Sequence, residues 1–118
     1  MNRRKPFVLV VEDDEVVCEA LRGLLSDDFD AVCVGTLASA RRLLDGGTCD
    51  LLVLDLMLGD GDGADLLAER RSRGPRAIVV SAKHDADRVA KKHGAAFVRK
   101  PFTDADLVAT IHACLSRR

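Results

Sequence analysis

Five short apolar runs recur along this chain, and each is separated from the next by a stretch with helical periodicity. The runs lie at residues 7–11, 31–34, 51–54, 77–80 and 96–99. The first four are nearly unbroken series of aliphatic residues, which is typical of strands buried on both faces. Because such strands need helices above and below them, the alternation predicts an α/β fold with a parallel sheet covered on both faces.

The stretches between the runs carry apolar residues three and four positions apart, as amphipathic helices do. This spacing predicts helices at residues 15–25, 37–44, 62–73, 85–93 and 103–116. Thr36 is suited to cap the start of the second helix, and Thr103 with Asp106 resembles a capping box for the last. Gly94 is expected to end the fourth helix.

The chain length of 118 residues indicates one domain, from 1 to 118, with a core from about residue 6 to residue 116. A net charge of −1 gives no bulk attraction to nucleic acid or to an anionic membrane. No apolar run approaches the ~18 residues that a membrane span needs, and the first run is too short for a signal peptide. We therefore expect a cytoplasmic protein that contacts neither nucleic acid nor membrane directly.

The four cysteines share no spacing typical of metal sites. They are Cys18, Cys33, Cys49 and Cys114. They lie in or near apolar segments, so the sequence predicts buried thiols rather than a disulfide or a zinc site.

Charged and polar residues follow four of the predicted strands. They are Glu12, Asp13 and Asp14 after the first, Asp55 after the third, Ser81 after the fourth and Lys100 after the fifth. In doubly wound sheets the ligand site lies beyond the carboxyl ends of the strands. Clustered carboxylates repel one another unless a cation joins them, and Mg²⁺ suits a site with one or two carboxylates, waters and a phosphoryl oxygen.

A carboxylate in such a cluster can attack phosphorus and form an acyl phosphate once a cation neutralises part of the charge. Lys100 and Ser81 are expected to contact the phosphoryl oxygens. Asp14 and Asp62 are explained equally well as helix N-caps.

Four motifs together resemble the response regulator receiver family of two-component signalling, over residues 6–116. They are VLVVEDD at 8–14, LDLMLGDGDG at 54–63, VSA at 80–82 and RKPF at 99–102. The resemblance implies a flavodoxin-like, doubly wound, five-stranded parallel sheet of order 2-1-3-4-5 with five helices on both faces.

The resemblance also implies roles for the residues around the metal. Asp55 is similar to the phosphoacceptor, which takes its phosphoryl group from a phosphohistidine. Asp13 matches the direct Mg²⁺ ligand, and Glu12 matches the acidic residue that reaches the metal through water. Met57 matches the position that offers its backbone carbonyl to the ion.

Further positions match the family's switching residues. Ser81 corresponds to the hydroxyl that turns toward the phosphoryl group, and Lys100 to the lysine that pairs with it. Phe97 stands at the switch aromatic, Gly63 at the loop glycine before the third helix, and Ala82 at a small residue that leaves the acceptor accessible.

The implied partners are a sensor histidine kinase or phosphotransfer protein and an unidentified downstream protein. Mg²⁺ is the implied cofactor, with Mn²⁺ as the alternative ion. The chain is expected to catalyse its own phosphotransfer and autodephosphorylation rather than to act as a conventional enzyme. We expect the output to be a partner protein, a phosphorelay step or self-association, with the chain itself a monomer or weak dimer.

The sequence departs from the family at two places. Gly59 stands where many relatives have proline, and the segment between Ser81 and Lys100 is a few residues shorter than usual. The shortened segment keeps open an alternative function, a phosphorylation-independent interaction module with the same fold. A flavodoxin-like FMN carrier is disfavoured because acids replace the expected phosphate-binding loop after the first strand.

Overall fold

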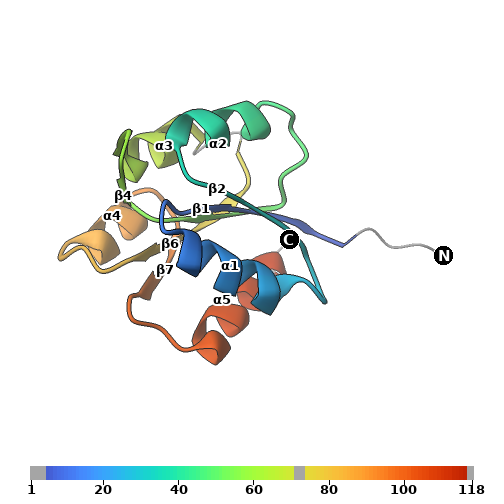
Figure 1. Ribbon diagram of the computed structural model, residues 1–118. Coiled ribbons are helices and arrows are strands. Elements are labelled where there is room, and N and C mark those ends of the chain that lie inside the picture. The colour runs from blue at the N-terminus through green and yellow to red at the C-terminus, as the bar shows by residue number, and fades with distance from the viewer. Residues whose placement is uncertain (1–4, 71–73, 117–118) are drawn as a thin grey trace.

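A five-stranded parallel sheet forms the centre of the molecule, in the order β2-β1-β3-β6-β7 (Figure 1). The structure is a computed structural model that describes residues 5–70 and 74–116. The strands of this sheet are β1 (Phe7–Val11), β2 (Asp30–Val34), β3 (Leu51–Leu54), β6 (Arg76–Ser81) and β7 (Ala96–Arg99). Counted in chain order, these strands have the arrangement 2-1-3-4-5, so the predicted topology is confirmed.

Helices cover both faces of the sheet (Figure 1). They are α1 (Glu15–Leu25), α2 (Leu37–Leu44), α3 (Gly63–Arg70), α4 (Ala86–Lys92) and α5 (Asp104–Ser116). Within residues 5–70 and 74–116, no helix has both the length and the apolar character needed to cross a lipid bilayer.

Alternating residues of the strands fill two separate cores. Leu9 and Val11 of β1 point into a core shared with α2, α3 and α4, whereas Val8 and Val10 point into a core shared with α1 and α5. All four side chains are at most 1% exposed. Burial on both faces explains why the run is apolar throughout instead of alternating with polar residues.

Local sequence features set most of the helix ends. Thr36 Oγ1 accepts a hydrogen bond from Ser39 N at 3.1 Å, and Thr103 Oγ1 accepts one from Asp106 N at the same distance. Gly94 has a φ of 71°, a left-handed conformation that glycine adopts without strain. The predicted extension of the third helix over residues 71–73 lies outside the described residues.

The sequence did not reveal a small hairpin directly after β3. Its strands are β4 (Met57–Leu58) and β5 (Gly61–Asp62), which pair antiparallel. These two-residue strands are too short to show any periodicity. The hairpin connects the end of β3 to α3.

The prediction that all cysteines are reduced thiols is wrong for two of them. Cys18 on α1 and Cys33 on β2 form a disulfide, with their Cα atoms 5.8 Å apart. Both side chains point into the space between α1 and the sheet, where a helix residue and a strand residue come within bonding range. Neighbouring apolar residues in the sequence could not reveal this pairing, because it depends on how α1 packs on β2.

Candidate functional site

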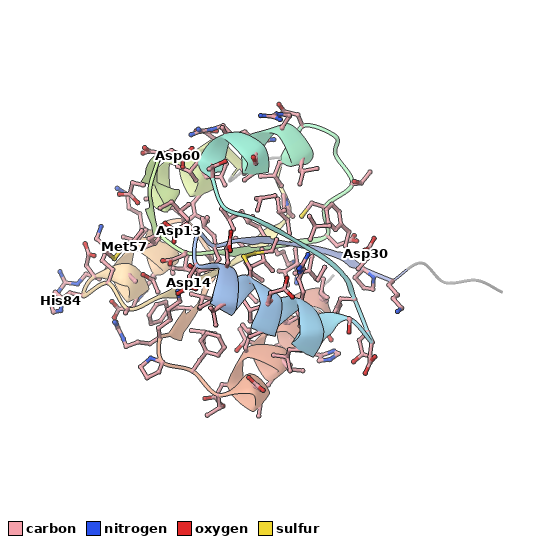
Figure 2. The ribbon with its side chains drawn as sticks, viewed as in Figure 1. Asp13, Asp14, Asp30, Met57, Asp60 and His84 are labelled. Carbon is pink, nitrogen blue, oxygen red and sulfur yellow. A yellow bond between two sulfur atoms is a disulfide. The ribbon has the colours of Figure 1, made fainter. Side chains whose placement is uncertain are left out.

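The polar residues that follow the strands gather at the carboxyl edge of the sheet. Figure 2 shows Asp13, Met57 and Asp60 toward this end of the molecule, with Asp30 toward the other end. The parallel register aligns the strands: Val11 at the end of β1 pairs with Leu54 at the end of β3. The chain therefore leaves both strands at the same edge, with Glu12 and Asp55 next in sequence.

Lys100 joins two mostly buried carboxylates at this edge. Its Nζ donates to Glu12 Oε1 at 2.6 Å and to Asp55 Oδ2 at 3.1 Å. Glu12 is 5% exposed and Asp55 is 9% exposed. Two carboxylates that share one ammonium retain a net negative charge, so the site favours a further cation.

The ammonium of Lys100 is held in its charged form. Partial burial of the group works against its charge, but the hydrogen bonds that it donates to Glu12 and Asp55, together with the attraction to their charges, outweigh this effect. As a result the pKa of Lys100 lies above its ordinary value. Lys100 is therefore a permanent positive charge beside Asp55 near neutral pH.

Backbone contacts orient the Asp55 side chain. Its Oδ1 accepts a hydrogen bond from Met57 N at 3.1 Å, and its own N–H donates to Val11 O at 3.0 Å. Gly63 packs so closely that a Cβ there would lie 2.7 Å from the Asp55 carbonyl oxygen. Asp55 is thus held between β1, the hairpin and the start of α3.

The three acids after β1 have different roles. Glu12 faces inward to Lys100, and its Oε2 accepts from Asp14 N at 3.2 Å. Asp14 caps α1, since its Oδ1 accepts from Val16 N at 2.9 Å. Asp13 is exposed. Asp62 is also a cap, with its Oδ1 accepting from Ala64 N at 2.9 Å.

The donor atoms at this edge fit Mg²⁺ better than a metal that needs a complete protein cage. No group of three or more His, Cys, Asp or Glu side chains within the described ranges is arranged to hold a metal alone. Mg²⁺ is typically bound by one or two carboxylates, with waters and a phosphoryl oxygen completing its shell. The exposed Asp13 and the oxygens of Asp55 supply hard ligands of this kind, in a site whose charge is negative.

Ser81, at the end of β6, is fully buried and its hydroxyl is engaged. Its exposed fraction is 0%, and its Oγ accepts a hydrogen bond from Lys83 N at 3.1 Å. Because a hydroxyl that accepts one hydrogen bond can still donate its own proton, this contact breaks only if the side chain rotates away from Lys83 N.

Arg99 connects Phe97 to the loop that follows Ser81, a contact that the sequence did not indicate. Its guanidinium carbon lies 4.9 Å from the centre of the Phe97 ring, and its Nη1 donates to Lys83 O at 3.1 Å. Phe97 itself is half-buried against the core beneath α2, α3 and α4. The only sequence signal for this contact was the position of Arg99 directly before Lys100.

Asp60 at the tip of the hairpin is a second residue whose role was not predicted. Its carboxylate accepts from Leu37 N at 3.0 Å and from Ala38 N at 3.3 Å, so it caps α2 from 23 residues away in sequence. These hydrogen bonds, chiefly the one from Leu37, hold the pKa of Asp60 below its ordinary value of 3.8.

The depressed pKa predicts a pH-dependent contribution to stability. The folded state favours the charged carboxylate of Asp60. Its contribution to the free energy of unfolding is therefore complete above pH 3.8 and is lost as the pH falls through the lower pKa of the folded state. Asp60→Asn should lower the free energy of unfolding near neutral pH, and its difference from wild type should shrink below pH 3.8. Urea unfolding at several pH values, from neutral to below 3.8, measures the difference in the free energy of unfolding. Asp27→Asn, at an exposed turn, is the control for deleting one charge. A difference that does not change with pH would contradict the assignment.

Comparisons with known proteins agree with this geometry. The model of the response regulator receiver domain matches residues 8–112. The chain is 34% identical, over 115 residues, to the sensory transduction protein RegX3 of Mycolicibacterium smegmatis, covering 93% of this chain and 50% of that protein. It is 35% identical to the transcriptional regulatory protein FixJ of Azorhizobium caulinodans, covering 93% and 55%. The chain thus spans about half the length of these curated relatives.

A solved structure with a similar fold is the non-phosphorylated HemR receiver domain of Leptospira biflexa. It superposes with a TM-score of 0.86 at 29% identity, over 97% of each chain. A response regulator receiver protein from Burkholderia phymatum gives a TM-score of 0.84 at 30% identity, over 95% of this chain and 96% of that one. The family match over most of the chain, the sheet order and the carboxyl-edge residues agree: the chain belongs to the response regulator receiver family.

Proposed function

We propose that Asp55 accepts a phosphoryl group from a phosphohistidine on a sensor histidine kinase or a phosphotransfer protein. The observation that carries this proposal is the pair of contacts that Lys100 makes with Asp55 and Glu12 at the carboxyl edge. They hold one carboxylate beside a fixed positive charge, an arrangement suited to phosphoryl transfer.

The transfer begins with a carboxylate oxygen of Asp55 attacking the phosphorus. The new phosphorus–oxygen bond forms as the phosphorus–nitrogen bond to the histidine breaks, and the imidazole leaves. Lys100 stabilises the phosphoryl oxygens, because its raised pKa keeps it charged throughout. Hydrolysis of the acyl phosphate by water returns Asp55 to its carboxylate, so the same site supports autodephosphorylation.

Mg²⁺, or Mn²⁺ as the alternative ion, would be held by Asp13 and Asp55, by the backbone carbonyl of Met57 and by Glu12 through water. When bound, the ion offsets the negative charge that the carboxylates and the phosphoryl group bring together. Asp13 is exposed and Met57 is 61% exposed, which leaves both open to solvent at this edge.

Switching would pass from Ser81 to the surface around β7. If the Ser81 hydroxyl turns to the phosphoryl oxygens, it gives up its hydrogen bond with Lys83 N. Arg99 binds the carbonyl of the same Lys83 and covers Phe97, so a movement of this loop changes the support of the aromatic ring. An altered surface of this kind would be read by an unidentified downstream protein.

An apolar groove beside Lys100 supports docking of the phosphodonor. It has a volume of about 520 Å³ and lies between α1 and the segment that leads into α5. Val16 on its rim is 78% exposed, an unusual exposure for a large aliphatic residue next to a polar site. A cytoplasmic partner protein that covers this groove would bring its phosphohistidine close to Asp55. The chain itself would act as a monomer or weak dimer.

Labelling by a small acyl phosphate tests the proposal without a known kinase. With acetyl phosphate and Mg²⁺, the chain should gain the mass of one phosphoryl group, and chelation of the metal should prevent the gain. Intact-mass spectrometry measures both results. Unlabelled protein under all conditions would instead favour the phosphorylation-independent interaction module.

A further inference from the structure

We propose that Cys18 and Cys33 form a reversible thiol–disulfide site whose redox state controls the order of the acidic loop at residues 12–14. The disulfide links the first turn of α1 to β2. In proteins of reducing compartments such bonds are chiefly transient and redox-sensing. A cross-link in a chain with the proposed cytoplasmic location therefore points to regulation.

Both cysteines are accessible to small redox reagents. Each is half-buried, and both line an open pocket of about 360 Å³ together with Glu12 and Asp13. Cys49 is also half-buried, and its Sγ donates to Leu51 O at 3.2 Å. A stable product of exchange needs a second cysteine within bonding range, and Cys18 and Cys33 meet this condition with Cα atoms 5.8 Å apart.

The cross-link acts directly on the backbone of the acidic loop. Cys18 Sγ lies 3.2 Å from the carbonyl oxygen of Glu12, and Glu12 N donates to Val34 O at 2.9 Å, next to Cys33. The loop then leads into α1, where Asp14 caps the helix. The disulfide thus connects the start of α1 to β2, beside the segment that carries Glu12 and Asp13. Reduction leaves only non-covalent packing between α1 and β2.

The redox step is a balanced thiol–disulfide exchange with a low-molecular-weight disulfide such as glutathione disulfide. One cysteine thiolate attacks the small disulfide, forms a mixed disulfide and releases one small thiolate. The second cysteine thiolate then attacks the protein sulfur of the mixed disulfide and releases the other. The two protein thiols lose two protons and two electrons, and the electrons reduce the small disulfide to two thiols. An excess of the small thiol reverses both steps.

Formation of the bond is independent of the phosphoryl chemistry, whereas its effect on Mg²⁺ binding rests on the proposed function. Fixing the residues that support a metal site preorganises its ligands, and loss of such support costs roughly tenfold or more in metal affinity. We therefore expect Mg²⁺ to bind the oxidised chain about tenfold more tightly than the reduced chain.

The experiment equilibrates the full chain in glutathione buffers of increasing oxidising strength, then alkylates it after unfolding. Of the four cysteines, we expect all to be alkylated in reducing buffer and only Cys49 and Cys114 in oxidising buffer. Amide resonances of residues 12–14 should differ between the two forms, and a Mg²⁺ titration of each gives the affinities. The Cys49→Ser/Cys114→Ser double variant should keep this response, whereas Cys33→Ser should lose it.

Distinct results overturn distinct parts of the proposal. Alkylation of all four cysteines in every buffer would show that no reversible pair exists. Identical resonances of residues 12–14 in the two forms would show that the pair does not control the loop. Failure of both forms to bind Mg²⁺, with the pair and the resonance changes intact, would count against the proposed function and leave the redox site standing. The comparison of the two forms uses the wild-type chain, so it does not depend on a variant that folds.

Discussion

Asp55→Asn should abolish phosphoryl incorporation from acetyl phosphate. The asparagine side chain can still accept a hydrogen bond from Met57 N, as Asp55 Oδ1 does at 3.1 Å, so the loop should keep its conformation. The amide lacks the nucleophilic carboxylate and leaves Lys100 with only Glu12 as an ionic partner. We expect the rate of labelling to fall by roughly 10³-fold or more, the scale of losses seen when an enzyme nucleophile is removed.

Intact-mass spectrometry over time gives the labelling rate, and thermal unfolding shows whether the variant is folded. Asp30→Asn is the matched control, because it deletes an exposed carboxylate toward the other end of the sheet (Figure 2). This control should label at the wild-type rate. Undiminished labelling of a folded Asp55→Asn protein would mean that another residue is the acceptor.

Gly63→Ala should destabilise the protein by about 1–3 kcal/mol, the usual cost of an added methyl group in a packed interior. The new Cβ would lie 2.7 Å from the Asp55 carbonyl oxygen and 3.0 Å from Leu56 Cα. Both are backbone atoms, which cannot move aside as the end of a flexible side chain can. Relief of the clash must therefore displace either the start of α3 or the peptide of Asp55.

Gly23→Ala adds the same methyl group at a position with open space, and it should stabilise the protein instead of destabilising it. Gly23 lies within α1, and a Cβ there would meet nothing within 4 Å. Replacing a helical glycine by alanine should stabilise the protein by about 0.5–1 kcal/mol. Urea unfolding of both variants measures the two differences. Equal effects at the two positions would show that the close packing of Gly63 on Asp55 does not matter for stability.

Much of this fold could be predicted because its elements are regular and its strands are buried on both faces. The runs at Phe7–Val11, Leu51–Leu54 and Ala96–Arg99 are strands with the predicted bounds, as Glu15–Leu25 and Leu37–Leu44 are helices. Buried parallel strands leave a continuous apolar pattern, and helices leave a periodic one. The convergence of Glu12, Asp55 and Lys100 followed from the rule that parallel strands end at one edge.

The contacts that escaped prediction all join residues that are far apart in the chain and have no shared local pattern. Cys18 and Cys33 meet because α1 packs on β2. Asp60 caps α2 only because the hairpin folds back toward Leu37. Arg99 reaches Lys83 from the neighbouring strand. Each depends on how elements pack in three dimensions, which periodicity and capping motifs do not specify.

The hairpin of β4 and β5 connects the Asp55 carboxylate to the start of α2 through two hydrogen bonds. One end of the link is the hydrogen bond between Asp55 and Met57 N, and the other is the bond between Asp60 and Leu37 N. Only Leu58 and Gly59 lie between Met57 and Asp60 in the chain. A displacement of Met57 that followed a change at the Asp55 side chain would therefore also act on Asp60, whose carboxylate holds the start of α2.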